Sequence, residues 1–280
     1  MTPIFEKTIR ARSGWLRFDW AGLWRYRDLL WLNVRRDFVS RFQQTILGPA
    51  WYVIQPIVTA LVFTIVFGQS GQKGPPAFLF FQGGMLLWSF FATILGAAGN
   101  TFHTNAAVFT KVYFPRLIVP LAVGISSLVP LAIQATVFLV AYAYAMLTAT
   151  APTWHADAIG LLLLPWSILQ TGLFGLGVSL VTSALSAKYR DLQHALPFVV
   201  QMWMFVTPVI FPYERLGHVA RIVAVLNPLT PLVESVRLAF FGSGTVTLPL
   251  FATSLALTLL TLVGGLILYQ RAERTFADTV

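Results

Sequence analysis

Very few side chains in this sequence of 280 residues could support acid–base, metal or phosphate chemistry. There is no cysteine, and the four histidines, His103, His155, His194 and His218, are scattered without a carboxylate cluster. We therefore expect no metal site, because metal ions need grouped thiolates, imidazoles or carboxylates. No G-x-x-x-x-G-K-[ST] phosphate loop occurs. The chain is accordingly predicted to carry no cofactor and to catalyse no covalent reaction.

One charged pair, Glu234 and Arg237, stands out in an apolar neighbourhood near the C-terminal end of the sequence. Residues three apart on a helix can form an ion pair, and an unpaired charge in a medium of low dielectric constant is costly. The pair follows the helix-breaking Asn227-Pro228 dipeptide. Two interpretations stay open, a structural clasp and an outer gate made of Asn227, Pro228, Glu234 and Arg237. Either way, exchanging the two charges should partly restore what a single substitution loses.

The amino-acid composition of the chain indicates its fold class, and therefore the kind of helix on which these residues lie. Hydrophobic residues make up 57% of the chain, charged residues make up 10%, and the mean hydropathy is +0.73. A water-soluble fold of this size could not bury so much apolar surface, and a disordered chain would need more charge. The net charge of +9 fits cytoplasmic segments of a membrane protein better than a nucleic-acid partner. The prediction is an all-α integral membrane protein.

Six uncharged segments are long enough to be membrane spans. The first has 19 residues, or roughly 28 Å of helix, and the hydrocarbon core is about 30 Å thick. The third is long enough to bend at Pro120 and Pro130, and the Gly172–Gly177 run of the fourth could let another helix approach closely. The predicted transmembrane domain covers residues 50–270, with spans at 50–68, 77–99, 117–147, 158–187, 195–211 and 246–269.

The distribution of basic residues predicts the orientation of these spans. Of the 19 lysines and arginines, 15 lie in the N-terminal segment, the C-terminal tail and the two loops on the same side. Because basic residues concentrate in the cytoplasm, residues 1–49 and the tail 271–280 are expected to be cytoplasmic. The segment 100–116 then also lies inside, whereas the segment 212–245 lies outside.

Two further segments are predicted to be helical without spanning the membrane. Trp20–Leu47 has apolar residues at helical spacing beside arginines, which favours an amphipathic helix at the membrane interface over a packed cytoplasmic helix. Its charged residues include Arg35, Arg36, Asp37 and Arg41. Pro212–Thr245 is too apolar for a free loop and suggests two short re-entrant helices. For the second of these, we expect Thr230 as the cap, Pro231 at the first position and Gly242 at the end.

Aromatic residues make up 14% of the chain, and their flat faces could contact the rings of sugars. Most such rings in membrane proteins are packing or interface residues instead. The aromatic residues that we single out for such contacts are Tyr52, Trp88, Phe90, Phe91, Trp166, Trp203 and Phe205.

Several motifs resemble the type-2 ABC permeases that export polysaccharides. They are Arg35-Arg36-Asp37-Phe38, the run from Arg41 to Trp51, Gln55-Pro56, the run from Val62 to Gly68, the run from Lys111 to Leu121, Tyr189-Arg190-Asp191, and Asn227-Pro228 with Glu234 and Arg237. The similarity is greatest to the O-antigen and teichoic-acid branch, and the capsule branch stays open. The resemblance implies a homodimer of six-helix subunits, two ATPase subunits that hold ATP and magnesium, and a lipid-linked glycan as cargo.

The residues themselves also favour a separate ATPase, because no helix centre carries the charge that an ion-coupled carrier needs. The inner-side segment before the third span offers aromatic and basic anchors for such a partner. The predicted coupling residues are Phe109, Lys111, Tyr113, Phe114, Pro115 and Arg116. The expected location is the bacterial inner membrane. A lipid or drug exporter and a membrane scaffold without transport activity are the alternatives.

Overall fold

The computed structural model describes residues 20–43, 47–68, 75–105, 114–149, 152, 154–189 and 191–279. Within these residues every regular element is a helix, which confirms the all-α class. The elements are α1 (Trp20–Arg25), α2 (Arg27–Phe42), η1 (Gly48–Ala50), α3 (Trp51–Phe67), α4 (Ala77–Ala98), α5 (Thr101–Thr104), α7 (Ile118–Ser126), α8 (Leu128–Thr148), α9 (Ala158–Lys188), α10 (Leu192–Val206), η2 (Tyr213–Arg215), α11 (His218–Val225), α12 (Leu229–Phe241) and α13 (Leu248–Thr279).

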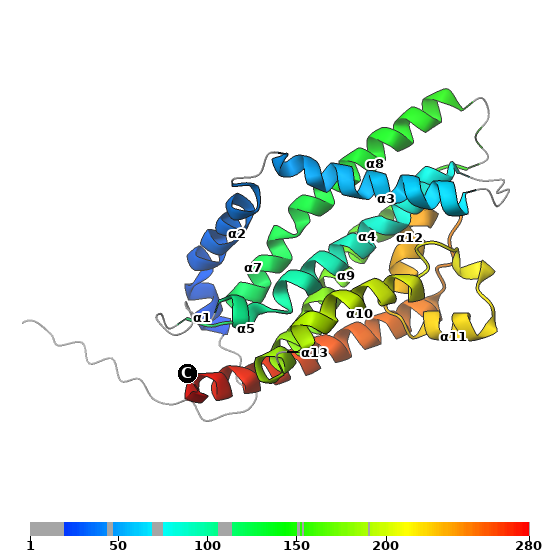
Figure 1. Cartoon of the computed structure of the whole chain (residues 1–280). Coiled ribbons are helices and arrows are strands. Elements are labelled where there is room, and N and C mark those ends of the chain that lie inside the picture. Colours follow the sequence, from blue (N-terminus) through cyan, green and yellow to red (C-terminus); the bar gives the residue numbers. More distant parts are fainter. Residues whose placement is uncertain are drawn as a thin grey trace, which may run out of the picture.

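The helices run back and forth between two ends of an elongated molecule (Figure 1). Helices α1, α2 and α5 and the C-terminal part of α13 gather at one end, and α11 and α12 lie at the other. Most of the described basic residues lie on the helices gathered at the first end, among them Arg25, Arg27, Arg35, Arg36 and Arg271. We call this end the inner end and the opposite one the outer end, after the orientation expected from the sequence, which stays a prediction.

Within the described residues, four helices are long and apolar enough to cross a membrane, or up to five if the bent pair α11 and α12 forms one span. They are Ala77–Ala98, Ile118–Thr148, Ala158–Lys188 and Leu248–Glu273. The remaining two predicted spans correspond to α3 and α10, which have 17 and 15 residues and so fall short of the usual length of about 20. The structure thus supports a multi-pass membrane protein, and the count of six spans stays a prediction.

The third predicted span contains a break, but not at a proline. Helix α7 ends at Ser126 and α8 begins at Leu128, with Ser127 between them. The hydroxyl of Ser127 donates to the carbonyl of Val123 at 2.7 Å. The break places Pro130 in the first turn of α8, where its missing N–H costs nothing.

Helix α4 lies at the centre of the molecule and packs against α3, α8, α9 and α12. Helix α9 approaches its neighbours closely at glycine residues. A Cβ on Gly177 of α9 would lie 2.8 Å from the backbone nitrogen of Leu262 on α13. A Cβ on Gly160 of α9 would lie 2.4 Å from the backbone nitrogen of Ala239 on α12. Helix α9 therefore contacts both α12 and α13 backbone to backbone.

The N-terminal amphipathic segment forms two helices, and α2 packs on α7. Leu23, Leu29 and Leu30 pack against a buried cluster at the inner end, whereas Trp24 and Trp31 are 72% and 61% exposed. One face is thus packed on protein and the other is free. The placement of the free face in the membrane surface stays a prediction.

Candidate functional site

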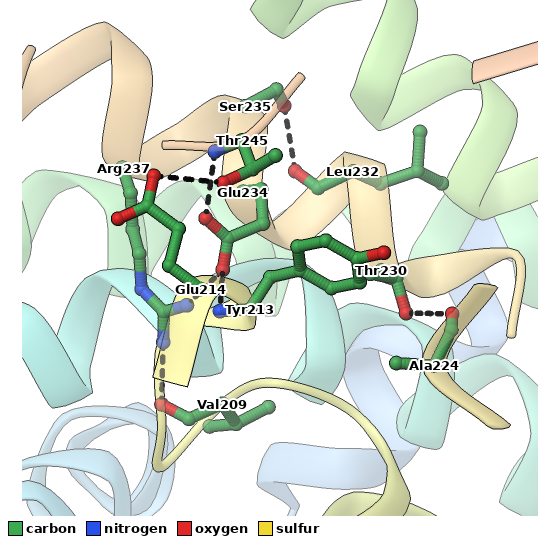
Figure 2. A network of polar contacts seen from close by, with 10 residues as sticks. All are labelled: Val209, Tyr213, Glu214, Ala224, Thr230, Leu232, Glu234, Ser235, Arg237 and Thr245. Atoms are coloured by element: carbon green, nitrogen blue, oxygen red, sulfur yellow. Dashed lines mark hydrogen bonds and ion pairs between the residues drawn. The ribbon is translucent and has the colours of Figure 1, made fainter. Parts of the chain in front are cut away.

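The charged pair Glu234–Arg237 lies on α12 at the outer end, and each residue is only 1% exposed (Figure 2). The guanidinium of Arg237 pairs with the carboxylate of Glu234. Its Nη2 donates to the carbonyl of Val209 at 2.8 Å, and its Cζ lies 4.1 Å from the ring centre of Phe80 on α4. Both charges are therefore removed from solvent inside one chain.

The carboxylate of Glu234 also holds two backbone segments that are distant in sequence. Its Oε1 accepts the N–H of Tyr213 at 3.2 Å, and its Oε2 accepts the N–H of Thr245 at 3.1 Å. Figure 2 shows these bonds converging on α12. The side chain of Glu214 joins this network, because it accepts the hydroxyl of Thr245 at 3.0 Å. The pair thus connects the loop after α10, helix η2 and the loop before α13.

Space for the guanidinium comes from a glycine on α4. A Cβ on Gly84 would lie 3.3 Å from Nη2 of Arg237 and 3.0 Å from the carbonyl oxygen of Val209. Both distances are tighter than ordinary van der Waals contact. The Gly84 position therefore lets α4, α12 and the loop after α10 meet.

The Asn227-Pro228 break has the predicted position, and the two helices that it separates, α11 and α12, meet at 99°. The side chain of Asn227 forms hydrogen bonds both with the start of α12 and with the end of α10. Its Oδ1 accepts the N–H of Leu229 at 3.1 Å and the indole N–H of Trp203 at 3.3 Å, and its Nδ2 donates to the hydroxyl of Thr207 at 2.8 Å. Asn227 therefore ties the end of α10 to the start of α12.

Two details of the predicted cap were wrong, and one is confirmed. Thr230 is the second residue of α12, and its hydroxyl donates instead to the carbonyl of Ala224 in α11 at 2.6 Å. Pro231 is the third residue because the helix already begins at Leu229. Gly242 does end the helix, with a left-handed φ of 62°.

A polar contact that the sequence analysis missed connects α9, α12 and α13. The amide nitrogen of Gln170 on α9 donates to the hydroxyl of Ser254 on α13 at 2.8 Å, and that hydroxyl donates to the carbonyl of Pro228 at 2.6 Å. The indole of Trp166 donates to Gln170 at 2.8 Å. A glutamine within an apolar span is the sequence signal, since such residues usually find a partner on another helix.

At the inner end, the predicted coupling residues divide into two groups. Phe109, Lys111 and Tyr113 lie outside the described residues. Phe114 is buried at 6% exposure in the cluster at the inner end, and Pro115 is half-buried. Phe114 therefore packs the C-terminal end of the predicted coupling segment into this cluster.

Arg116 belongs to the same predicted coupling group and bonds to the end of α13. Its guanidinium donates to the carbonyl of Glu273 at 2.9 Å, and its backbone N–H donates to the carboxylate of Glu273 at 3.4 Å. The C-terminal end of the predicted coupling segment is thus bonded to α13.

The charged residues predicted for the interface helix lie on α2. Arg35 is exposed, and Arg36 donates to the side chain of Asn105 at 3.4 Å and pairs with Asp37 at 3.7 Å. The side chain of Arg41 lies outside the described residues. The Arg36–Asn105 bond connects α2 with the inner end of the α4–α5 segment.

Three of the seven proposed glycan-path aromatics are core residues of this chain. Trp88, Phe90 and Phe91 are 5%, 4% and 0% exposed, because α4 is the central helix. Phe91 stacks on Phe174 with ring centres 5.3 Å apart. Within this chain these three rings are therefore packing residues, and their place on a glycan path stays a prediction.

The remaining four aromatics are more accessible. Phe205 is 59% exposed and Trp166 is 42% exposed, whereas Tyr52 and Trp203 are half-buried.

One cavity, between α4, α9 and α10, has a volume of about 120 Å³ and is far too small for a glycan chain. No group of histidine or carboxylate side chains in the described residues could hold a metal ion.

Apolar helices of spanning length, packed around a central α4, define a multi-pass membrane protein. The chain belongs to the ABC-2 type transporter family, whose profile matches residues 28–241. Membership makes it a permease, the membrane component of a transporter.

Three relatives illustrate the similarity. An O-antigen export system permease protein of Myxococcus xanthus is 29% identical over 222 residues, covering 78% of this chain and 82% of the relative. A Klebsiella pneumoniae protein of the same description is 24% identical over 257 residues, 90% and 94% of the two chains. A polysialic acid transport protein of Escherichia coli is 24% identical over 244 residues, 85% and 91% of the two chains.

Proposed function

We propose that this chain is the membrane-spanning permease subunit of an ATP-driven exporter that moves a lipid-linked polysaccharide out of the cytoplasm, with an O-antigen as the cargo. The observation that carries the proposal is the similarity, over 78% to 90% of the chain, to permeases described as O-antigen exporters. Similarity to a polysialic acid transport protein favours capsule export as the second candidate. A teichoic-acid, lipid or drug exporter and a scaffold without transport activity are further alternatives.

We propose that the transporter contains two copies of this chain and two ATPase subunits in the bacterial inner membrane, with both termini in the cytoplasm. A glycan needs a wide polar path, and a single chain that packs its central helix against its neighbours offers little room for one. A path between two copies meets this need. The half-exposed faces of Trp166 and Phe205, together with Tyr52 and Trp203, supply ring surfaces for sugars.

The ATPase partner is proposed to contact the inner end at the segment that includes Phe109, Lys111 and Tyr113. Phe114 and Arg116 support this role because they fix the end of the segment to the helical bundle. Substituting Phe109 or Tyr113 by alanine is expected to weaken ATPase binding or to uncouple ATP hydrolysis from export, with membrane insertion intact.

The proposal is tested by deleting the gene and measuring surface glycans in cells. We expect loss of the O-antigen from the surface and accumulation of lipid-linked glycan inside, both reversed by the wild-type chain. Loss of capsule with intact O-antigen would favour the second candidate. Unchanged surface glycans of every kind would refute polysaccharide export.

A further inference from the structure

Helix α13 contacts the coupling segment at one end and the Asn227-Pro228 break at the other. It is 32 residues long, or about 48 Å. Figure 1 shows it running from the outer end, beside α11, to the inner end, beside α1 and α5. Its backbone is continuous along this whole length. A continuous helix keeps its length when it moves, so a shift at one end appears at the other.

At the inner end, the side chain of Tyr269 contacts residues on both sides of the predicted coupling segment, Phe102 before it and Arg116 at its C-terminal end. On the N-terminal flank, the ring of Phe102 in α5 stacks on that of Tyr269, with centroids 4.7 Å apart and planes 30° apart. On the C-terminal flank, the hydroxyl of Tyr269 donates to the carbonyl of Arg116 at 3.3 Å. Tyr269 is fully buried, so neither flank can move without displacing it.

One turn further along α13, Glu273 adds a second contact to the same flank. Its backbone carbonyl and its carboxylate accept the guanidinium and the backbone N–H of Arg116. Arg116 is therefore held by α13 through three hydrogen bonds. Such a cluster transmits rotation of α13 as well as translation.

At the outer end, Ser254 of α13 bonds to the break between α11 and α12. Its hydroxyl donates to the carbonyl of Pro228 at 2.6 Å, and both groups are buried. Pro228 is the residue at which the chain turns by 99° from α11 into α12. A displacement of Ser254 therefore acts directly on the bend.

We propose that α13 is the mechanical link between the ATPase-facing inner end and the outer end, with Tyr269 and Ser254 as its two positioning residues. The inference rests on the proposed function, because the movement comes from a partner ATPase. Fifteen residues separate the two positions along one helix, or about 22 Å. Small shear movements of packed helices are a common means of transmission in such assemblies. The close glycine contact of α9 with α13 at Gly177 guides the movement along the helix axis.

The test is a reporter of movement at the outer end in the assembled transporter. The chain contains no cysteine, so the substitution Val219→Cys, at a position on α11 that is 74% exposed, provides one labelling site per chain. An environment-sensitive fluorophore there is read with and without Mg-ATP in the complex with the ATPase. Hydrolysis and export are measured on the same preparations.

The informative variants are Ser254→Ala and Tyr269→Phe, which both preserve size, and Tyr269→Ala, which also removes the ring. Matched controls are Thr253→Ala, whose hydroxyl donates only within α13, and Tyr144→Phe, which is 69% exposed on α8. We expect Ser254→Ala and Tyr269→Ala to reduce the ATP-dependent signal and the export per ATP hydrolysed by at least about fivefold, the lower end of coupling between two sites. Tyr269→Phe should fall between these variants and the wild type, and the controls should match the wild type.

Wild-type signals in Ser254→Ala and Tyr269→Ala would overturn the link, as would a wild-type complex that exports glycan without any signal change at position 219. Equal losses in the controls would overturn it as well, because the effect would then not depend on the two contacts. Failure of the proposed function looks different: the wild-type chain would neither bind an ATPase nor export a glycan.

Discussion

The buried pair on α12 gives the most quantitative prediction of this structure, through the substitution Glu234→Gln. Glutamine keeps the shape of the side chain but removes its charge, which leaves the guanidinium of Arg237 unpaired at 1% exposure. An uncompensated buried charge costs about 3–5 kcal/mol. Glutamine also retains one acceptor oxygen, whereas Glu234 uses one oxygen for Tyr213 and the other for Thr245. The lost bond raises the expected destabilisation to at least about 4 kcal/mol.

The double variant Glu234→Gln with Arg237→Met removes both charges, so it separates the cost of an unpaired buried charge from the cost of the altered side chains. Because it buries no unpaired charge, it should be more stable than Glu234→Gln alone by about 2 kcal/mol or more. The matched control is Glu214→Gln in the same network, where the side chain is exposed and accepts the hydroxyl of Thr245. That control should change the stability by about 0.5 kcal/mol or less.

The assay is denaturant unfolding of the purified chain in detergent, followed by the fluorescence of its nine tryptophans. A loss of less than about 1 kcal/mol in Glu234→Gln would show that solvent reaches the pair and would refute the reasoning. So would a double variant no more stable than the single one. The sequence alone suggested that exchanging the two charges would partly restore what a single substitution loses. The structure changes this expectation: the exchange should fail to restore stability, because an arginine at position 234 would face the N–H groups of Tyr213 and Thr245.

Three further predictions concern packing, polar contacts and assembly. Gly160→Ala should destabilise the chain by about 1–3 kcal/mol in the same unfolding assay, because the added Cβ meets the backbone of Ala239, whereas Gly264→Ala, with no heavy atom within 4 Å, should not destabilise it. Gln170→Leu should cost about 1–2 kcal/mol, since Ser254 loses a buried partner, and an unchanged unfolding midpoint would contradict this. Native mass measurement of the transporter should find two permease and two ATPase chains, and a transport-competent complex with one permease chain would contradict the proposed dimer.

Local relationships could be read from the sequence. The ion pair was predictable because residues 234 and 237 are three apart on a helix, and the break was predictable because proline lacks the N–H that a helix needs. Gly242 was predictable as a helix end because glycine readily adopts the left-handed conformation that ends many helices, and its φ is 62°. In each of these cases a few neighbouring residues determine the geometry.

Relationships between distant segments were not predictable. The partners of Glu234 at Tyr213 and Thr245 are backbone groups, which carry no sequence signature. The burial of Trp88 and Phe91 was missed for a different reason. In a lipid-exposed helix both faces are apolar, so hydrophobic periodicity does not separate the core face from the lipid face.

The contacts of α12 have a consequence for how the protein is made. The helix has 13 residues and carries two charges, so it is too short and too polar to enter a bilayer as a spanning segment. Its stabilising partners lie on α4 and α9, which are synthesised earlier, and on α13, whose Ser254 is synthesised later. The contacts of α12 are therefore complete only once α13 has been made. A chain truncated before α13 would therefore lack the bond from Ser254 to Pro228, whereas the contacts of Arg237 with Phe80 and with the carbonyl of Val209 come from segments that are already present.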